Sequence, residues 1–336
     1  MFKGKSFGSD NHSGVHPAVL DAIREANTGH QPAYGADTVT QEASRLFRKT
    51  FGDEVEVFFV FTGTAANTLA IRGLCRPYEA VVATSIAHLN EDECGAPEFI
   101  AGNKIIGIPP IDGKLPLESL EKLRMNPSDP HRVLPRLVTL TQATELGTVY
   151  RLDETRAITE LAHARGMLVH IDGARLANAA VHLNCSLGDL TTALGVDALS
   201  FGGTKNGLLC AEALVFLRPN LSPNFAFIRK QSMQLASKMR FLACQFLPYL
   251  DDQLWKKNAS NANAMALYLR RKLDTITGCR FPQETEANEV FAILPEPWAN
   301  HMRERARAYN WDHEMLRFVA SFDTTKADID SLFIGI

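Results

Sequence analysis

Short apolar runs alternate with amphipathic segments from about residue 50 to residue 217. Residues 65–75 and 153–165 are the clearest amphipathic segments. The second is expected to form a helix with Asp153 as its N-cap and with Gly166 in the left-handed position that ends it. This alternation predicts an α/β domain with a mostly parallel sheet and helices on both faces. Seven apolar runs are the predicted strands: 55–61, 80–84, 104–108, 137–141, 167–172, 197–201 and 211–217.

The pattern changes beyond about Phe225, where long polar–apolar helices are predicted to continue to about Arg271. Two strand-like segments, 289–294 and 315–321, follow, and a last helix is expected from Thr325. We therefore expect a large domain over residues 1–245, which includes an N-terminal arm, and a smaller α+β domain over residues 246–336.

Polar segments follow several of the predicted strands. Ligands bind beyond the carboxyl ends of strands in such sheets, so these segments are expected to gather at one edge. Asp172 ends one run, with Arg175 three residues later, and it could bind a metal, a ribose hydroxyl or a protonated ring nitrogen, or act as a cap. Lys205 lies in a glycine-flanked turn, where partial desolvation would favour the neutral amine of Schiff-base chemistry; a solvated loop lysine is the alternative. The segments are 62–67, 88–93, 142–145, 172–175 and 202–206.

The run 55–61 leads into Thr62, Gly63 and Thr64, and a helix is expected to start at about Ala65. Free N–H groups at a helix start suit a phosphate, although a plain helix cap has the same sequence. The GxGxxG spacing and the Walker A pattern are both absent. Their absence disfavours a nicotinamide cofactor and a P-loop nucleotide site.

His88 follows a predicted strand and has Glu91, Asp92, Glu93 and Cys94 nearby. A zinc site would need more ligands at suitable spacing, and no second histidine supplies one. We interpret His88 as a structural histidine or as a ring that stacks on a flat cofactor. Together, a phosphate cradle, an anion for a cationic ring nitrogen and a lysine for a carbonyl indicate one ligand, pyridoxal 5′-phosphate (PLP).

The composition of the 336 residues narrows the class of protein. Hydrophobic residues make up 46% of the chain, which allows a sizeable core, and a net charge of -3 gives no general attraction to nucleic acid or to anionic membranes. The apolar runs are too short to span a bilayer, and the first ten residues lack the apolar segment of a secretory signal. The six cysteines form no CxxC pair, so we expect reduced, mostly buried thiols of a cytoplasmic protein.

Nine motifs in order along the chain resemble the threonine aldolase family, within the aspartate-aminotransferase-like (fold type I) PLP enzymes. The low-specificity L-threonine aldolases of the bacterial type and their relative phenylserine aldolase are the most similar members. The pair DGAR and TKNG, about thirty residues apart, is the most specific signal. The motifs are SDN at 9–11, AYG at 33–35, TGTAAN at 62–67, AHLNEDECGAPEF at 87–99, VTLTQATELGTVY at 138–150, HIDGAR at 170–175, FGGTKNG at 201–207, LASKMRF at 235–241 and LRFVASFDT at 316–324.

The resemblance implies how the cofactor would be held. Lys205 would form the Schiff base with PLP, Asp172 would pair with the ring nitrogen, and Arg175 would contact the side of the ring hydroxyl. Family members are homotetramers built from dimers that share active sites, so Arg240 would reach the phosphate from a neighbouring subunit. The implied cofactor-binding residues are Gly63, Thr64, His88, Asp172, Arg175, Lys205 and Arg240.

The resemblance also implies a substrate site and catalytic roles. Arg317 would bind the substrate carboxylate, helped by Ser9. His88 would lie near the substrate hydroxyl, with Glu93 close by, and is the best candidate for the base. The implied catalytic residues are Lys205, His88 and Asp172, and the implied substrate-binding residues are Ser9, Arg317, Glu93, His30 and Tyr34.

The implied reaction is retro-aldol cleavage of L-threonine, L-allo-threonine or a related β-hydroxy-α-amino acid such as L-phenylserine to glycine and an aldehyde. The stretch Gln142, Ala143, Thr144 and Glu145 stands where many relatives have Asn-Thr-His-Asn, so the role of that histidine as a base cannot be transferred. A β-eliminating lyase, a racemase and a catalytically silent relative of the same fold remain alternatives. The alternative without PLP is a metal-dependent hydrolase that uses His88, Glu91, Asp92 and Asp172.

Overall fold

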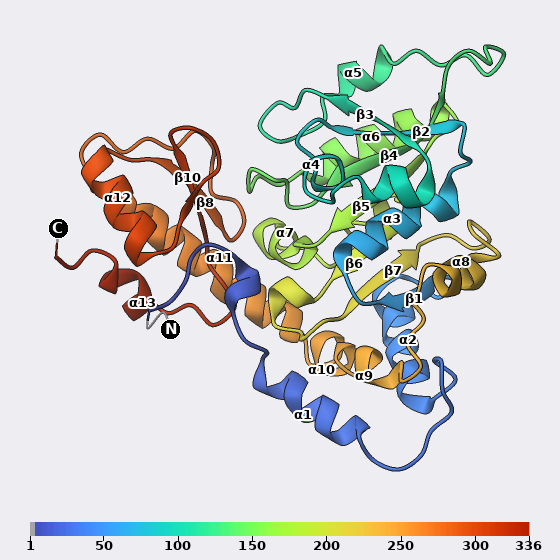
Figure 1. The fold of residues 1–336 in the computed structure, drawn as a ribbon, viewed down its shortest axis with the longest axis horizontal. Coiled ribbons are helices and arrows are strands. Elements are labelled where there is room, and N and C mark those ends of the chain that lie inside the picture. The colour runs from blue at the N-terminus through green and yellow to red at the C-terminus, as the bar shows by residue number, and fades with distance from the viewer. Residues whose placement is uncertain (1–3, 336) are drawn as a thin grey trace.

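The computed structural model describes residues 4–335, and its largest element is a seven-stranded sheet in the order β1-β7-β6-β5-β4-β2-β3 (Figure 1). Only β7 runs antiparallel to its neighbours β1 and β6, and the other pairs are parallel. This confirms the predicted mostly parallel sheet, and each predicted run overlaps one strand. The strands are β1 (Glu56–Val60), β2 (Glu79–Thr84), β3 (Lys104–Ile108), β4 (Leu134–Thr141), β5 (Leu168–Gly173), β6 (Ala198–Gly202) and β7 (Glu212–Phe216).

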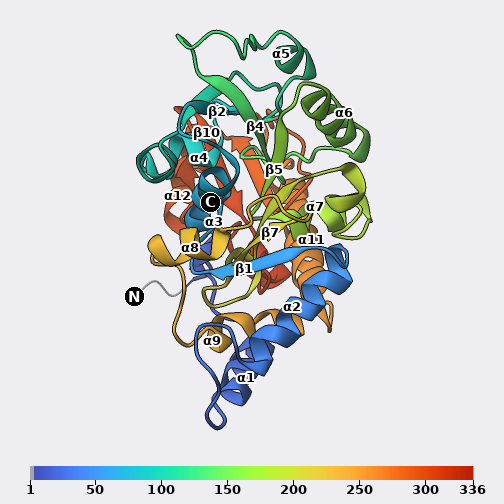
Figure 2. The ribbon, with the colours of Figure 1, turned by 90° about the vertical axis from the view of Figure 1, so that its right-hand side faces the viewer.

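Helices cover both faces of this sheet. Figure 2 shows α3 (Gly63–Leu74) and α8 (Phe225–Gln231) on one side and α2 (Thr38–Phe51), α6 (Leu152–Ala164) and α7 (Leu176–Leu183) on the other. Strand β7 shows why both faces must be covered: Leu214 and Phe216 pack in the core beneath α3, and the alternate residues Ala213 and Val215 pack in the larger core of the opposite face. The other helices of this domain are α1 (Pro17–Ala26), α4 (His88–Glu91), α5 (Leu117–Glu121), α9 (Arg240–Ala243) and α10 (Phe246–Leu250), with short turns at Asp10–His12, Pro97–Ala101, Thr192–Leu194 and Thr204–Asn206.

The ends of α3 and α6 follow from local hydrogen bonds. The Thr62 hydroxyl accepts from the Ala65 N–H at 3.1 Å, so α3 begins at Gly63, two residues before the predicted start. The prediction of Asp153 as the N-cap of α6 was wrong. Arg151 is the N-cap, because Glu154 in the first turn accepts the Arg151 N–H at 2.7 Å. Gly166 ends the helix with φ of +75°, as predicted.

A smaller unit follows, with an antiparallel sheet in the order β8-β10-β9. Both predicted strands are present, as β8 (Glu289–Ile293) and β10 (Met315–Val319), whereas the two-residue β9 (Tyr309–Asn310) was not predicted. The N-terminal arm joins this unit, because Phe7 lies in its core and exchanges main-chain hydrogen bonds with Ala306 and Val319. The remaining helices are α11 (Leu254–Leu273), α12 (Glu296–Arg305) and α13 (Lys326–Ser331).

Helix α11 connects the two units. Leu254, Trp255 and Ala259 in its first half pack in the core of the large sheet. Met265 and Leu269 in its second half pack in the core of the small one. A single helix therefore spans both cores, and the division of the chain at residue 245 remains a prediction.

The six cysteines form no disulfide, but fewer are buried than the sequence predicted. Cys75 and Cys244 are buried, Cys94 is exposed, and the other three are partly exposed. Within residues 4–335, no helix is long and apolar enough to cross a membrane. The prediction that the chain begins without a secretory signal rests partly on residues 1–3, which lie outside the described residues.

Candidate active site

A cavity of about 710 Å³ lies between the carboxyl edge of the large sheet and the small sheet. It brings together residues that are far apart in the sequence. Nine of the predicted site residues line it: Ser9, Gly63, Thr64, His88, Glu93, Asp172, Arg175, Lys205 and Arg317. The other three, His30, Tyr34 and Arg240, do not line the cavity of this chain. Tyr34 is exposed and lies beneath Lys230, and the guanidinium of Arg240 packs over Phe241.

Asp172 stands at the carboxyl end of β5 and is almost fully buried. Its Oδ1 accepts from the Ala174 N–H at 3.0 Å, and its Oδ2 accepts from the Asn67 side chain at 2.8 Å. His170, two residues earlier on the same strand, hydrogen-bonds Ser200 at 2.9 Å, and burial lowers the pKa of His170 to about 4. His170 is therefore a neutral structural histidine, and Asp172 is the residue of β5 that faces the cavity.

Asn67 links Asp172 to His88. Its amide nitrogen donates to Asp172 at 2.8 Å and to Glu93 Oε1 at 2.9 Å, and the same Glu93 oxygen pairs with His88 Nδ1 at 2.9 Å. The hydrogen bond with Glu93 is the main reason that the pKa of His88 is raised; burial and the charge of Lys205 oppose it, and the charge of Asp172 supports it. Sequence reasoning quoted the motif that contains Asn67 but gave the residue no role. The available signal was a polar residue within the mostly apolar sequence of α3, because a buried polar side chain needs partners.

Lys205 lies in the short turn Thr204–Asn206 directly after β6. Glu212, the first residue of β7, also lines the cavity and accepts from the Thr204 N–H at 3.2 Å. Burial raises the pKa of Glu212 to about 7, against the hydrogen bonds of Thr204 and the charge of Lys205. Glu212 was not predicted as a site residue, because site residues were expected after the carboxyl ends of parallel strands. An antiparallel strand brings its first residue to that same edge.

The start of α3 forms one end of the cavity. Gly63 and Thr64 are the first two residues of the helix, so their N–H groups have no acceptor within it. A side chain added at Gly63 would meet no atom within 4 Å, so the approach to these donors is open. Two free N–H groups, the Thr64 hydroxyl and the positive end of the helix dipole match the chemistry of a phosphate.

The small sheet supplies Arg317, from β10, to the opposite wall. The Arg317 guanidinium lies 4.7 Å from the centre of the Tyr309 ring and 5.2 Å from that of Trp311. Its Nη1 is 3.5 Å from Glu289 Oε1. No pattern in the sequence marks Tyr309, Trp311 or Glu289 as site residues. They reach the cavity only through the packing of the small sheet.

A second partly buried arginine, Arg175, lies near the same carboxylate as Arg317. Arg175 donates to both carboxylate oxygens of Asp10, at 2.8 and 3.1 Å, and lies 3.6 Å from Glu289. Burial alone would raise the pKa of Asp10, but the charges of Arg175 and Lys205 hold it below its usual value. Arg175 therefore binds the N-terminal arm to the site, in addition to lining the cavity as predicted.

The residues present fit PLP. One cavity holds a lysine amine, an anchored carboxylate and a helix start with open donors, which are the groups that an aldehyde, a ring nitrogen and a phosphate require. The residues of the hydrolase alternative are less well placed, because Glu91 does not line the cavity. Within residues 4–335, no three or more His, Cys, Asp or Glu side chains are grouped to hold a metal ion.

Comparison with known proteins places the chain in a family. The beta-eliminating lyase family matches residues 6–296. A low-specificity L-threonine aldolase of Pseudomonas aeruginosa is 44% identical over 95% of this chain and 93% of the relative, and one of another Pseudomonas species is 41% identical over 99% and 97%. The structure of Leishmania major threonine aldolase superposes with a TM-score of 0.90 and 30% identity over 98% of each chain. The chain therefore belongs to the threonine aldolases of the beta-eliminating lyase family and is a PLP-dependent lyase of fold type I.

Proposed function

We propose that this chain cleaves L-threonine, L-allo-threonine and related β-hydroxy-α-amino acids such as L-phenylserine to glycine and an aldehyde. One observation carries the proposal: Lys205 and Asp172 share a single cavity with Arg317, so one bound amino acid would meet the cofactor groups on one wall and a carboxylate-binding arginine on the other. The names of the relatives support the same reaction.

Four residues of the large domain would hold the cofactor. Gly63 and Thr64 would bind the phosphate, Asp172 would bind the ring nitrogen, and Lys205 would bind the aldehyde carbon. Bound PLP supplies an electron sink, which stabilises the negative charge that develops at the substrate Cα when the Cα–Cβ bond breaks. Asn67 and Ala174 orient Asp172 for this role, because each donates a hydrogen bond to its carboxylate.

The substrate would be oriented from the opposite wall. Arg317 would bind its carboxylate through two parallel hydrogen bonds, with Ser9 beside it. Glu289 and the rings of Tyr309 and Trp311 fix the guanidinium, so the carboxylate and the Cα–Cβ bond would take one orientation in the cavity.

His88 would take the proton from the β-hydroxyl of the substrate. Its Nδ1 faces Glu93 at 2.9 Å, so the carboxylate fixes the proton on Nδ1 and leaves Nε2 as the free acceptor. The raised pKa of His88 makes the ring a stronger base than an ordinary histidine.

A product assay tests this function. Purified enzyme with PLP is incubated separately with L-threonine, L-allo-threonine and L-phenylserine, and the expected products are glycine and either acetaldehyde or benzaldehyde in equal amounts. Formation of a keto acid and ammonia would indicate the β-eliminating alternative, and formation of the D-amino acid would indicate the racemase. Either result without glycine would contradict the proposal.

We further propose a cytoplasmic homotetramer, a dimer of dimers, in which His30, Tyr34 and Arg240 contribute to the site of a neighbouring subunit. Exposed apolar side chains such as Phe227 and Met233 support a contact between subunits that would bury them. The six cysteines form no disulfide, which supports the cytoplasmic location. Hybrid oligomers of a Lys205→Ala subunit and an Arg240→Ala subunit test whether neighbouring subunits share active sites. Activity in the hybrid above that of either variant alone is expected, and its absence contradicts shared sites.

A further inference from the structure

Glu145, four residues after the end of β4, carries a buried carboxyl group with two unequal oxygens. Its Oε1 accepts from the His88 main-chain N–H at 2.9 Å and from the Thr141 hydroxyl at 2.6 Å. Its Oε2 is buried and has no hydrogen-bond partner among residues 4–335. Burial, more than any neighbouring group, raises the pKa of Glu145 to about 7. A half-satisfied buried carboxyl group destabilises a fold, so its presence beside the cavity requires another explanation.

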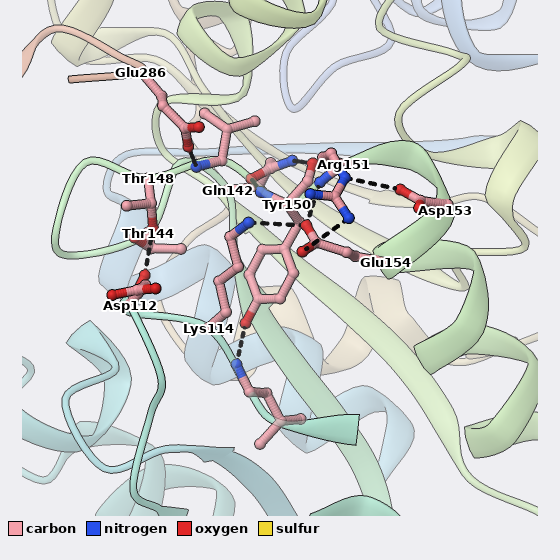
Figure 3. Close-up of polar contacts among 12 residues, drawn as sticks. Asp112, Lys114, Gln142, Thr144, Thr148, Tyr150, Arg151, Asp153, Glu154 and Glu286 are labelled. Atoms are coloured by element: carbon pink, nitrogen blue, oxygen red, sulfur yellow. Dashed lines mark hydrogen bonds and ion pairs between the residues drawn. The ribbon is translucent and has the colours of Figure 1, made fainter. Parts of the chain in front are cut away.

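The loop that carries Glu145 is held by other groups (Figure 3). The Gln142 side chain donates to the Tyr150 main-chain oxygen at 2.8 Å and accepts from its N–H at 3.0 Å. Thr144 and Thr148 share a hydrogen bond of 2.7 Å, and Glu286 accepts from the Val149 N–H at 2.6 Å. None of these contacts uses the Glu145 side chain. Most of the contacts that hold the loop are therefore independent of the Glu145 carboxyl group, which adds one bond to it, from Thr141 at the end of β4.

The group that depends on Glu145 is the main chain at His88. Helix α4 has only four residues, and its N-cap, Ala87, has no side chain that can cap it. The His88 N–H is the first donor of this helix and has no acceptor within it, so Glu145 caps α4 from a different part of the chain. Glu93 holds the His88 ring from the other side, at Nδ1. Two buried carboxyl groups thus fix the histidine at two points.

We propose that Glu145 is a positioning residue for the reaction: it fixes the main chain at His88 so that the imidazole, held by Glu93, presents its free nitrogen to the substrate hydroxyl. This inference rests on the proposed function of His88 as the base. It also gives a role to a residue of the stretch 142–145, to which the sequence alone assigns none.

Two substitutions at one position test the role. Glu145→Leu keeps the size and removes the acceptor, whereas Glu145→Gln keeps an oxygen that can accept from His88 and Thr141. We expect Glu145→Leu to lower kcat about tenfold or more with little change in KM, because a misplaced base affects the chemical step and not substrate binding. Glu145→Gln is expected to retain kcat within about threefold of the wild type. If the Leu variant does not fold, Glu145→Ser, which is too short to reach His88, replaces it.

The second readout is the titration of His88, followed by NMR in holoenzyme with labelled histidine. We expect the pKa of His88 to be lower in Glu145→Leu than in the wild type, because a shifted main chain weakens the contact with Glu93. In Glu145→Gln we expect it to match the wild type. Glu79→Leu is the matched control: Glu79 is also buried and accepts the Arg76 N–H at 2.6 Å, but it lies outside the cavity. It should leave kcat and the His88 titration unchanged.

Three results would overturn the proposal: wild-type kcat in the Leu variant, an unchanged His88 titration in that variant, or equal losses in the Gln and Leu variants. If wild-type enzyme cleaved no β-hydroxy-α-amino acid, the proposed function would fail. The titration would still decide whether Glu145 positions His88.

Discussion

The two walls of the cavity differ in the partners that hold their ionisable side chains. The wall from the large sheet presents carboxyl groups that are held by neutral donors: Asn67 donates to Asp172 and Glu93, and Thr204 donates to Glu212. The wall near the small sheet presents arginines that are paired with buried carboxylates, as Arg317 is with Glu289. The pKa of Glu212, about 7, lets this group exchange a proton near neutral pH, whereas the arginines of the second wall stay charged. The first wall therefore suits proton transfer, and the second suits binding of an anion.

Asp172→Asn, on the first wall, should have the largest effect on turnover. Asparagine carries an uncharged amide, so the variant lacks the negative charge that would face the ring nitrogen. We expect kcat to fall by roughly a thousandfold, the upper range for loss of one preorganised electrostatic group. Steady-state kinetics with L-allo-threonine, with circular dichroism to verify the fold, checks this. Undiminished kcat in a folded variant would remove Asp172 from the mechanism.

Arg317→Ala should affect binding as well as rate. Loss of the carboxylate-binding group is expected to lower kcat/KM by about a hundredfold, with a clear rise in KM, and Arg317→Lys should recover little of it because lysine lacks the two-pronged geometry. Arg280→Ala is the matched control, because Arg280 is an exposed arginine of the same domain. An unchanged KM for Arg317→Ala would place the substrate carboxylate elsewhere.

Glu212→Gln should raise stability at alkaline pH. The folded protein keeps the Glu212 proton up to a pKa of about 7, whereas the unfolded chain releases it near the ordinary value of 4.5. The unfolded state thus binds fewer protons between these values, so this group lowers the stability of the wild type as pH rises from 4.5 to 7. We expect the variant to gain about 3 kcal/mol at pH 8 and almost nothing at pH 4. Urea unfolding at both pH values measures this, and a loss of stability at pH 8 would contradict it.

Trp311→Leu should have the smallest effect. It removes one of the two rings that flank the Arg317 guanidinium, and a cation–π contact of this kind contributes about 0.5–2 kcal/mol. We therefore expect KM to rise by about thirtyfold at most, with kcat nearly unchanged. A fall in kcat with constant KM would show that Trp311 acts on the chemistry instead.

The two walls also differ in how far the sequence predicts them. Asp172, Lys205 and Gly63 each follow an apolar run, and parallel strands carry such residues to one edge, so pattern and topology suffice. Glu212 was missed because β7 runs in the opposite direction, and no local pattern distinguishes that strand from its parallel neighbours. Arg317 was identified only by resemblance.

The second wall depends on contacts between distant parts of the chain. Arg175 meets Asp10 across 165 residues, and Glu289 meets both Arg175 and Arg317. These pairs form only when the N-terminal arm and the small sheet pack against the large domain. The spacing of the residues along the chain therefore does not predict them. The wrong N-cap for α6 has a simpler cause: the acidic residue that satisfies the cap lies inside the first turn, at Glu154.

The most direct test of the central claim is the location of the cofactor bond. Holoenzyme is reduced with borohydride and digested, and mass spectrometry identifies the peptide that carries the pyridoxyl phosphate. We predict a single modified residue, Lys205, and no modified peptide from the Lys205→Ala variant treated in parallel. Modification of a different lysine in the wild type, or none at all, would contradict the account.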